Sequence, residues 1–223
     1  MRRARNYFAW QKRLVAPELG GRVVEVGCGV GNFTEALLDR DAVVVVDPDA
    51  ECLGCVRERF PDRPNLHTLC ADASDAAFLE VGRFLPDSCV CLNVLEHIED
   101  DEQAVRNMAS VIAPGGAIVL LLPAFSALYG PIDRNLGHYR RYRRDSVARL
   151  ADAAGLRIRR ARYMNMIGFF GWWINARVLR RHTQSAAQIE IFDRLAVPVM
   201  SRLENMAAPP FGQSLFAVLE KAA

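Results

Sequence analysis

The feature that most constrains this chain is an unbroken apolar run, Ala42 to Val46, that ends at Asp47 and Pro48. A strand without polar alternation is buried on both faces, which is typical of a parallel sheet covered by helices. Similar β-branched or apolar runs occur at residues 22–27, 66–71, 88–92 and 117–122, and helical spacing occurs between runs at 32–40, 49–59 and 104–112. The alternation predicts repeated strand–helix–strand units and therefore an α/β fold.

The pattern changes after Pro123. A loop rich in Gly, Pro, Tyr and Arg reaches Arg144, and a helix (145–154) and a strand (156–161) follow. Residues 163–210 show no strand alternation, and 214–219 read as one more strand. We therefore predict one domain, 1–223, with a Rossmann-like, doubly wound, mostly parallel sheet that has helices on both faces. A helical cap, 163–210, is inserted before the last strand.

Charge is distributed unevenly along the chain. The whole sequence has 28 basic and 26 acidic residues, but the segment from Arg134 to Arg181 holds 13 arginines and only two carboxylates, Asp145 and Asp152. Such a segment attracts a negatively charged partner. The aromatic residues within it do not form a recognisable nucleic-acid module, so nucleic acid is not favoured.

The cysteines and the apolar stretches bear on localisation. Six cysteines lie in the first half, and no apolar signal-peptide core follows the N-terminal arginines, which indicates reduced thiols and a cytoplasmic location. The spacing of Cys52, Cys55, Cys89 and Cys91 does not complete a zinc site. The longest apolar stretch, Tyr163 to Leu179, is interrupted by polar residues and is too short to span a membrane, although it could lie on the inner face of one.

A glycine-rich turn follows the first strand, in the segment Glu25-Val-Gly-Cys-Gly-Val-Gly31. Glycines between a buried strand and a helix let the backbone approach a polar ligand closely. The spacing is G-x-G-x-G and differs from the G-x-G-x-x-G of dinucleotide-binding folds. Asp47 lies 20 residues after Gly27, where a carboxylate can accept hydrogen bonds from a ribose.

With these motifs the chain resembles the class I S-adenosylmethionine-dependent methyltransferases. The segments that carry the resemblance are VVEVGCGVGNFT, VVDPD, CADAS and CLNVLEHI. The resemblance implies S-adenosylmethionine as cofactor and a lid helix within residues 1–20. The implied cofactor-binding residues are Tyr7 on the lid, Glu25, Gly27, Cys28, Gly29 and Gly31 at the methionine portion, Asp47 and Pro48 at the ribose, Asp72 and Ala73 at the adenine, and Asn93.

A smaller bacterial subgroup is also similar, through GPIDRNLGHYRRY and the cap segment MNMIGFFGWW. One difference concerns metals. Family members that methylate catechol-like quinone precursors carry a second carboxylate before the Glu-His pair, whereas this chain has Asn93 before Glu96 and His97. We therefore expect no metal.

The loop from Ala124 to Arg144 leaves the sheet at the edge where the cofactor is expected. His138 is the best candidate base in it, and Asp133 and Tyr139 are the other catalytic candidates. The candidates for acceptor binding are Tyr129, His97, Arg140 and Arg141. Structural roles remain open: His138 could bond a loop carbonyl, His97 could pack, and the arginines could form a solvated helix start.

The sequence thus predicts methyl transfer from S-adenosylmethionine to a small or lipid-linked acidic acceptor, such as a saccharide or a natural-product intermediate. The alternatives are a non-catalytic S-adenosylmethionine-binding module and a nucleotide-binding oxidoreductase. A homodimer and peripheral membrane contact are left open. The membrane interpretation rests on aromatic residues that lie next to arginines in the sequence, namely Phe169, Phe170, Trp172 and Trp173 beside Arg177, Arg180 and Arg181. The simpler alternative is that these aromatic side chains are buried under the cap or in a dimer interface.

Overall fold

The computed structural model describes residues 4–179, 183 and 186–223, and in this part of the chain it forms a seven-stranded sheet in the order β3-β2-β1-β4-β5-β7-β6. Strand β7 runs antiparallel to both neighbours and the other pairings from β3 to β5 are parallel. The predicted doubly wound, mostly parallel sheet is confirmed. The strands are β1 (Arg22–Val26), β2 (Ala42–Asp47), β3 (Leu66–Cys70), β4 (Ser88–Leu92), β5 (Ala117–Pro123), β6 (Leu156–Met164) and β7 (Ser214–Lys221).

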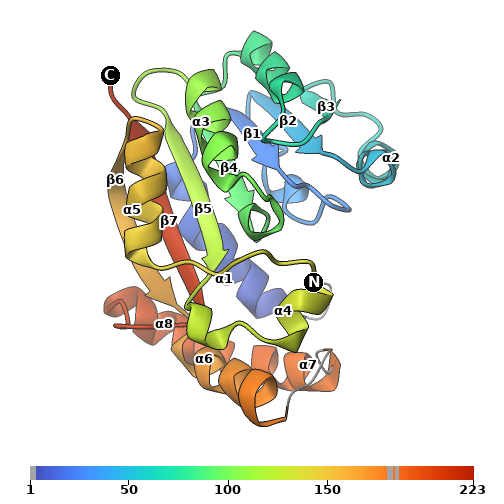
Figure 1. The fold of residues 1–223 in the computed structure, drawn as a ribbon. Helices are drawn as coiled ribbons and strands as arrows, with labels where there is room; N and C mark the ends of the chain where they lie inside the picture. The colour runs from blue at the N-terminus through green and yellow to red at the C-terminus, as the bar shows by residue number, and fades with distance from the viewer. Residues whose placement is uncertain (1–3, 180–182, 184–185) are drawn as a thin grey trace.

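Helices cover both faces of the sheet. Alternate residues of each strand enter two separate cores, for example Val24 with Met108 of α3 on one face and Val23 with Trp10 of α1 on the other. Figure 1 shows α3 and α5 in front of the sheet and α1 behind it. The α-helices are α1 (Arg5–Val15), α2 (Ala50–Arg59), α3 (Asp101–Val111), α4 (Pro131–Asn135), α5 (Arg144–Ala153), α6 (Met166–Trp173), α7 (Ala186–Leu195) and α8 (Val197–Met206). Shorter 3-10 helices are Ala16–Glu18, Thr34–Ala36, Ala76–Phe84, Leu95–His97 and Ser126–Leu128, and Ile174–Val178 is a π-helix.

Aspartates fix the starts of two helices. The Asp49 side chain accepts a hydrogen bond from the Glu51 amide at 2.8 Å, so it caps α2. Asp100 accepts from the Gln103 amide at 2.9 Å, and α3 therefore begins three residues before the predicted start at Ala104. Each cap satisfies an amide that the first turn of a helix leaves without a partner.

The predicted helix over residues 32–40 is wrong. The structure has one 3-10 helix there, Thr34–Ala36, between turns. Its hydrogen bonds join residues three apart, such as Leu37 N–H to Thr34 O at 2.9 Å. The Thr34 hydroxyl is buried and donates to the Glu25 carboxylate at 2.5 Å. This tertiary contact holds the segment against β1.

The predicted cap contains α6, α7 and α8, which lie beyond the carboxyl end of β5 at the bottom of Figure 1. Tyr163 and Met164 belong to β6, so the cap begins at Asn165. Its two ends meet. Met164 pairs with Ser214 in the sheet, and Gln213 N–H donates to Asn165 O at 3.0 Å. No helix in the described part of the chain has the combined length and apolarity that a membrane crossing requires.

Several of the clustered arginines lie on β6, an edge strand. Arg157 pairs with Glu220 at 2.8 Å, and Arg159 and Arg160 both pair with Glu18. Charged side chains on an edge strand oppose pairing with strands of other molecules. Part of the positive charge of the segment from Arg134 to Arg181 is therefore neutralised by ion pairs at the sheet edge.

Candidate active site

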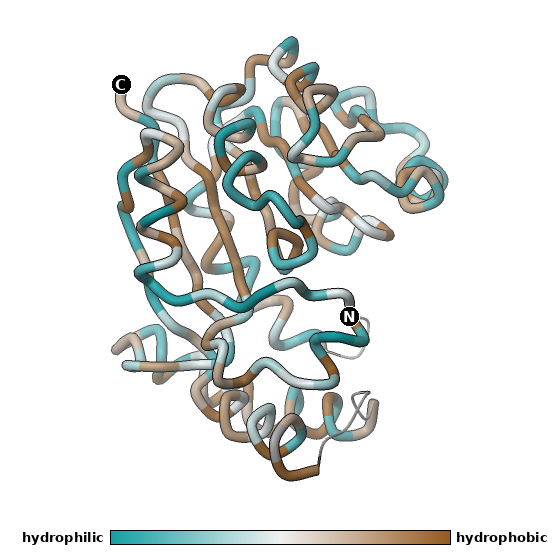
Figure 2. The backbone as a smooth tube through the Cα atoms, in the orientation of Figure 1, coloured by the Kyte–Doolittle hydropathy of each residue, from teal (hydrophilic) through white to brown (hydrophobic). Residues whose placement is uncertain are grey.

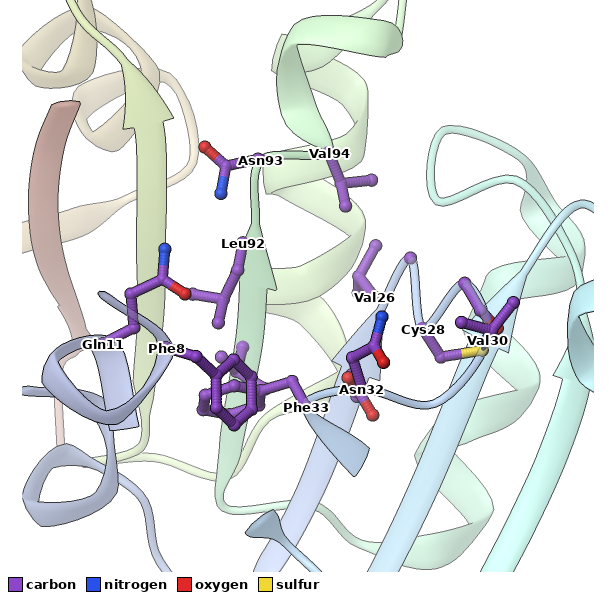
Figure 3. Close-up of a pocket in the computed structure, with 14 residues that line it drawn as sticks. Phe8, Gln11, Val26, Cys28, Val30, Asn32, Phe33, Leu92, Asn93 and Val94 are labelled. Atoms are coloured by element: carbon purple, nitrogen blue, oxygen red, sulfur yellow. Dashed lines mark hydrogen bonds between the residues drawn. The ribbon is translucent and has the colours of Figure 1, made fainter. Parts of the chain in front are cut away.

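A pocket of about 190 Å³ lies at the carboxyl ends of β1 and β4, where the strand order reverses. Ligands of open α/β sheets bind at this position. Figure 3 shows Phe8 and Gln11 reaching from α1 toward Leu92, across from Cys28 and Asn32. The lining residues are Phe8, Gln11, Glu25, Val26, Gly27, Cys28, Gly29, Val30, Asn32, Phe33, Val90, Leu92, Asn93 and Val94.

The glycine turn presents bare backbone to this pocket. Gly29 has a φ of +50°, and a Cβ atom built there would have no atom within 4 Å. Gly27 has a φ of +73°, and a Cβ atom there would lie 2.2 Å from the Val94 side chain. Gly27 is therefore required because a side chain there would clash with Val94. Gly29 leaves open space over the backbone, which a polar ligand can enter.

Asp47 lies behind the turn at the end of β2. Its Oδ2 accepts from Gly29 N–H at 2.9 Å and its Oδ1 accepts from Asp49 N–H at 3.0 Å. A carboxylate offers about four acceptor positions. Positions therefore remain for the hydroxyl groups of a ribose, while the contact with Gly29 ties Asp47 to the turn.

Glu25 lines the floor of the pocket and is almost fully buried. Burial raises its pKa to about 8, although the hydrogen bond from Thr34 acts in the opposite direction. A protonated carboxyl can donate as well as accept a hydrogen bond. Glu25 can therefore hold either a cationic or an anionic group of a ligand.

Gln11 is a pocket residue that the sequence analysis missed. It is 3% exposed, and its Nε2 is a buried amide nitrogen without a hydrogen-bond partner in the described part of the chain. A buried donor without a partner is costly. The carboxylate of S-adenosylmethionine would satisfy it, so the cradle and this amide fit the expected cofactor.

The loop after β5 brings Asp133 and His138 together. The Nδ1 atom of His138 lies 2.9 Å from Asp133 Oδ1, and the carboxylate also accepts from Gly130 N–H and Arg141 Nε. Burial alone would raise the pKa of Asp133, but the bond from His138 and the charge of Arg141 lower it below its usual value. Because an ionised carboxylate only accepts, Nδ1 carries a proton, and neutral His138 has its lone pair on Nε2.

This loop is fixed to the segment that leaves the pocket after Asn93. Tyr139 N–H donates to Glu96 O at 2.8 Å, and the Tyr142 hydroxyl donates to Leu95 O at 3.1 Å. The His138 ring contacts the His97 ring edge to face, with 4.7 Å between centroids. The Asp133–His138 pair therefore lies beside the chain that continues from the pocket wall.

A family model described as a methyltransferase domain matches residues 1–161. The chain belongs to this methyltransferase domain family. The match confirms the predicted class and, with it, S-adenosylmethionine as the cofactor. The match does not confirm the smaller bacterial subgroup that the loop motif suggests.

Individual relatives match parts of the domain. A ubiquinone biosynthesis O-methyltransferase of Coxiella burnetii is 30% identical, and the match covers 54% of this chain and 47% of that protein. A trans-aconitate 2-methyltransferase of Variovorax paradoxus is 32% identical, and the match covers 50% of this chain and 41% of that protein. The chain thus matches less than half the length of these relatives. The structure of the N-methyltransferase NodS of Bradyrhizobium japonicum, in complex with S-adenosyl-L-homocysteine, shares the fold, with a TM-score of 0.61 at 18% identity over 98% of this chain and 86% of NodS.

The structure brings only some of the predicted cofactor residues to the pocket of this methyltransferase domain. Glu25, Gly27, Cys28, Gly29 and Asn93 line it. Those that do not line it have other contacts: Asp47 accepts from the Gly29 and Asp49 amides behind the turn, Tyr7 bonds Ser214 through its hydroxyl, Gly31 packs near Val56, Pro48 accepts from Cys70, Asp72 accepts from Ser74, and Ala73 is buried in the core.

Three predicted acceptor-binding side chains have partners within the domain. Arg141 is 7% exposed, bonds Asp133 and Ala124 O, and lies over the Trp172 ring, so in this structure its guanidinium group holds the loop, and acceptor binding by Arg141 remains a prediction. Arg140 pairs with Asp101 at 2.7 Å. The Tyr129 hydroxyl donates to His138 O at 2.8 Å, which positions the histidine.

Glu96 is buried beside His138. Its Oε1 is 4.0 Å from His138 Nε2, beyond hydrogen-bond distance, and its Oε2 has no partner in the described residues. Glu96, His97 and His138 have potential ligand atoms within 4.8 Å of one another. The expected absence of a metal remains a prediction. Burial raises the pKa of Glu96 to about 8.

This pKa predicts a pH-dependent stability. In the unfolded chain Glu96 ionises near its ordinary value of 4.5, whereas in the folded protein it holds its proton until about pH 8. The folded state binds more protons between these values, so the free energy of unfolding falls as pH rises across this window. Glu96→Gln removes this dependence and should be more stable than the unchanged protein at pH 8, by roughly 2 to 4 kcal/mol.

Urea denaturation at pH 5, 6, 7 and 8 measures the effect. The difference between the variant and the unchanged protein should grow with pH, while Glu99→Gln, at an exposed position three residues further along the chain, should give curves parallel to the unchanged protein. Parallel curves for Glu96→Gln as well would contradict the assignment of a protonated Glu96.

Proposed function

We propose that the protein transfers the methyl group of S-adenosylmethionine to a hydroxyl or amine of an acidic acceptor, with His138 as general base. The observation that carries the proposal is the Asp133–His138 pair, 2.9 Å apart, next to the segment that continues from the cofactor pocket. The bound cofactor supplies an activated methyl group. The remaining requirements are alignment of the acceptor, exclusion of water and removal of one proton.

The chain's own residues supply these functions in the proposal. The Gly27–Gly29 backbone, Glu25 and Gln11 hold the methionine portion, and Asp47 holds the ribose. Asp133 fixes the tautomer and orientation of His138, so that Nε2 can take the acceptor proton. The lid role of α1 and the cap role of residues 165–213 belong to the same proposal.

The acidic character of the acceptor is supported by two arginines that form no ion pair with a carboxylate of the described residues. Arg143 and Arg144 are exposed at the start of α5, with their guanidinium groups over the rings of Phe125 and Tyr163. Arginine binds carboxylate or phosphate through two parallel hydrogen bonds. The names of similar proteins include O-methylation and N-methylation, and the sequence leaves oxygen, nitrogen and carbon open as the acceptor atom. The proposal takes oxygen or nitrogen, from which a base would remove a proton, and carbon remains the alternative.

The subgroup resemblance through the segment 130–142 is retained as part of the proposal. A saccharide, a natural-product intermediate or a lipid-linked molecule would each meet the chemical requirements. A non-catalytic S-adenosylmethionine-binding module is the principal alternative. It would bind the cofactor with the same pocket and show no turnover.

The experiment is to incubate the purified protein with deuteromethyl-labelled S-adenosylmethionine and acidic metabolite and lipid extracts, and to search by mass spectrometry for products that are 17 Da heavier than their precursors. Each product should be absent when His138→Ala replaces the unchanged protein. Labelled products made equally by both proteins would contradict the role of His138. Cofactor binding without any labelled product would support the non-catalytic alternative.

A further inference from the structure

A second hollow, of about 390 Å³, lies between α1 and α8, away from the cofactor pocket. No acidic side chain lines it. Arg13 and Arg202 both face it, and within the described residues neither guanidinium has a hydrogen bond or an ion pair. The lining residues are Asn6, Arg13, Pro198, Ser201, Arg202 and Asn205.

Three groups of this hollow are left to donate hydrogen bonds, the Arg13 and Arg202 guanidinium groups and the Asn205 amide, whereas the Ser201 hydroxyl and the Asn6 amide nitrogen already donate to Pro198 O and Asp193 O. The Asn205 Oδ1 atom already accepts from the Trp10 indole at 3.1 Å, which leaves the amide nitrogen as a donor. Together with the two guanidinium groups, this nitrogen suits a phosphate, because phosphate accepts several charge-assisted hydrogen bonds at once.

Exposed apolar side chains lie beside the hollow. Leu203 and Val199 flank Arg202 along α8 and are 62% and 60% exposed, and Met206 is 85% exposed. Ile191 and Leu195, four residues apart on the preceding helix α7, are 60% and 68% exposed, and the five residues together are called the α7–α8 stripe. Figure 2 shows apolar stretches on the cap helices at the bottom of the molecule.

Apolar exposure is concentrated in the cap. Of the large hydrophobic residues with high exposure, 11 lie between Ile167 and Met206 and only five lie elsewhere in the described chain. Exposed apolar side chains that are concentrated in one part of a soluble protein indicate a site of interaction. The surface therefore requires a partner that offers both anions and an apolar phase.

We propose that the α7–α8 stripe and the adjoining hollow dock on a membrane that contains anionic phospholipid. A phosphate headgroup occupies the hollow between Arg13 and Arg202, and Val199, Leu203 and Met206 enter the boundary between headgroups and acyl chains. Arginines directly beside apolar side chains match this boundary. A second copy of the chain would cover the stripe but would leave the two arginines without anions.

The membrane contact that the sequence left open on Tyr163 to Leu179 is thereby proposed on α7 and α8 instead. Trp172 is buried against Leu128, and Phe169 packs on Phe125 and Phe211, so two of the four aromatics face inward. Phe170 and Trp173 are about half exposed. Arg180 and Arg181 lie outside the described residues.

Docking at this surface would also affect α1. Asn6 and Arg13, seven residues apart, lie on one side of the helix, whereas Phe8 and Gln11, three residues apart, line the cofactor pocket from another side. A headgroup bound by Arg13 would hold the helix that closes the cofactor pocket. The membrane proposal does not depend on the proposed methyl transfer.

Sedimentation with vesicles tests the proposal. The protein is mixed with vesicles of phosphatidylcholine alone or with 30% phosphatidylserine, at 20 mM and 500 mM salt. We expect binding to the anionic vesicles at low salt only, because salt screens the arginines. An arginine near an anionic surface raises the membrane partition coefficient about fivefold, so the double variant Arg13→Gln/Arg202→Gln should lower this coefficient about 30-fold. Leu203→Glu, which places a charge in the apolar stripe, should also lower the partition coefficient.

Matched controls are Arg63→Gln and Leu79→Glu, an exposed arginine and an exposed leucine outside the cap. Both should bind vesicles as the unchanged protein does, and circular dichroism should be the same for all variants. The proposal is overturned if the unchanged protein stays in the supernatant at low salt, or if the variants of the hollow bind like the controls. It is also overturned if sedimentation velocity shows a dimer that Leu203→Glu dissociates.

Discussion

Replacing His138 with alanine is expected to lower the turnover of the proposed methyl transfer by about 10²-fold or more. Asp133 holds the proton of Nδ1, so the lone pair of Nε2 is the group that can accept a proton in this loop. Without it, the acceptor must lose its proton to water. The affinity for S-adenosylmethionine should be retained, because His138 does not line the cofactor pocket.

Turnover and acceptor affinity separate the possible roles of this histidine. Steady-state kinetics on the product identified by labelling should show a lower kcat with little change in KM. His67→Ala is the matched control, since that ring stacks on Phe84 beside β3 and touches neither site. If His138→Ala raises KM and leaves kcat unchanged, the histidine binds the acceptor and the role of base is wrong.

Replacing Asp47 with alanine is expected to weaken S-adenosylmethionine binding by roughly 2 to 4 kcal/mol, or about 30- to 1,000-fold. The substitution removes the carboxylate proposed to accept from the ribose hydroxyls, and it also frees Gly29 N–H from its 2.9 Å contact. Isothermal titration calorimetry measures the dissociation constant directly and requires no acceptor.

Asp47→Asn distinguishes these two effects. Asparagine keeps an acceptor for Gly29 N–H but loses the charge, so its affinity should lie between those of alanine and the unchanged protein. Asp39→Ala, at an exposed aspartate, is the control and should bind normally. An unchanged dissociation constant in folded Asp47→Ala would sink the ribose assignment.

The strands could be predicted from sequence because each apolar run carries its own signal. The β2 strand is buried at all six positions, as its unbroken run requires. The segment 32–40 could not be predicted in the same way. Its conformation depends on the buried contact between Thr34 and Glu25, and helical spacing contains no information about such a tertiary contact.

Sequence could indicate the parts of the site whose backbone conformation is set by a local motif. It could not indicate the side chains whose position depends on a residue distant in the sequence. Gly27 and Gly29 were found because the turn needs glycine. Gln11 was missed, because a polar residue on an amphipathic helix ordinarily faces solvent, and only the packing of α1 against the sheet buries it. The sequence also could not show that Asp133 lies beside Arg141.

The cap leaves and re-enters the sheet at a single register pair, Met164 with Ser214, closed by Asn165 and Gln213. Because these ends are adjacent, the free energy of closing the intervening segment depends only weakly on its length. A change in the length of the segment between them therefore does not by itself shift the register of β6 and β7. The cap is nonetheless coupled to the donor-binding half, because Asp193 accepts from the Asn6 and Tyr7 amides of α1 and because Val197 and Met200 pack in one core with Trp10. The loop ends thus tolerate a change in length, whereas α7 and α8 carry the position of the helix beside the cofactor.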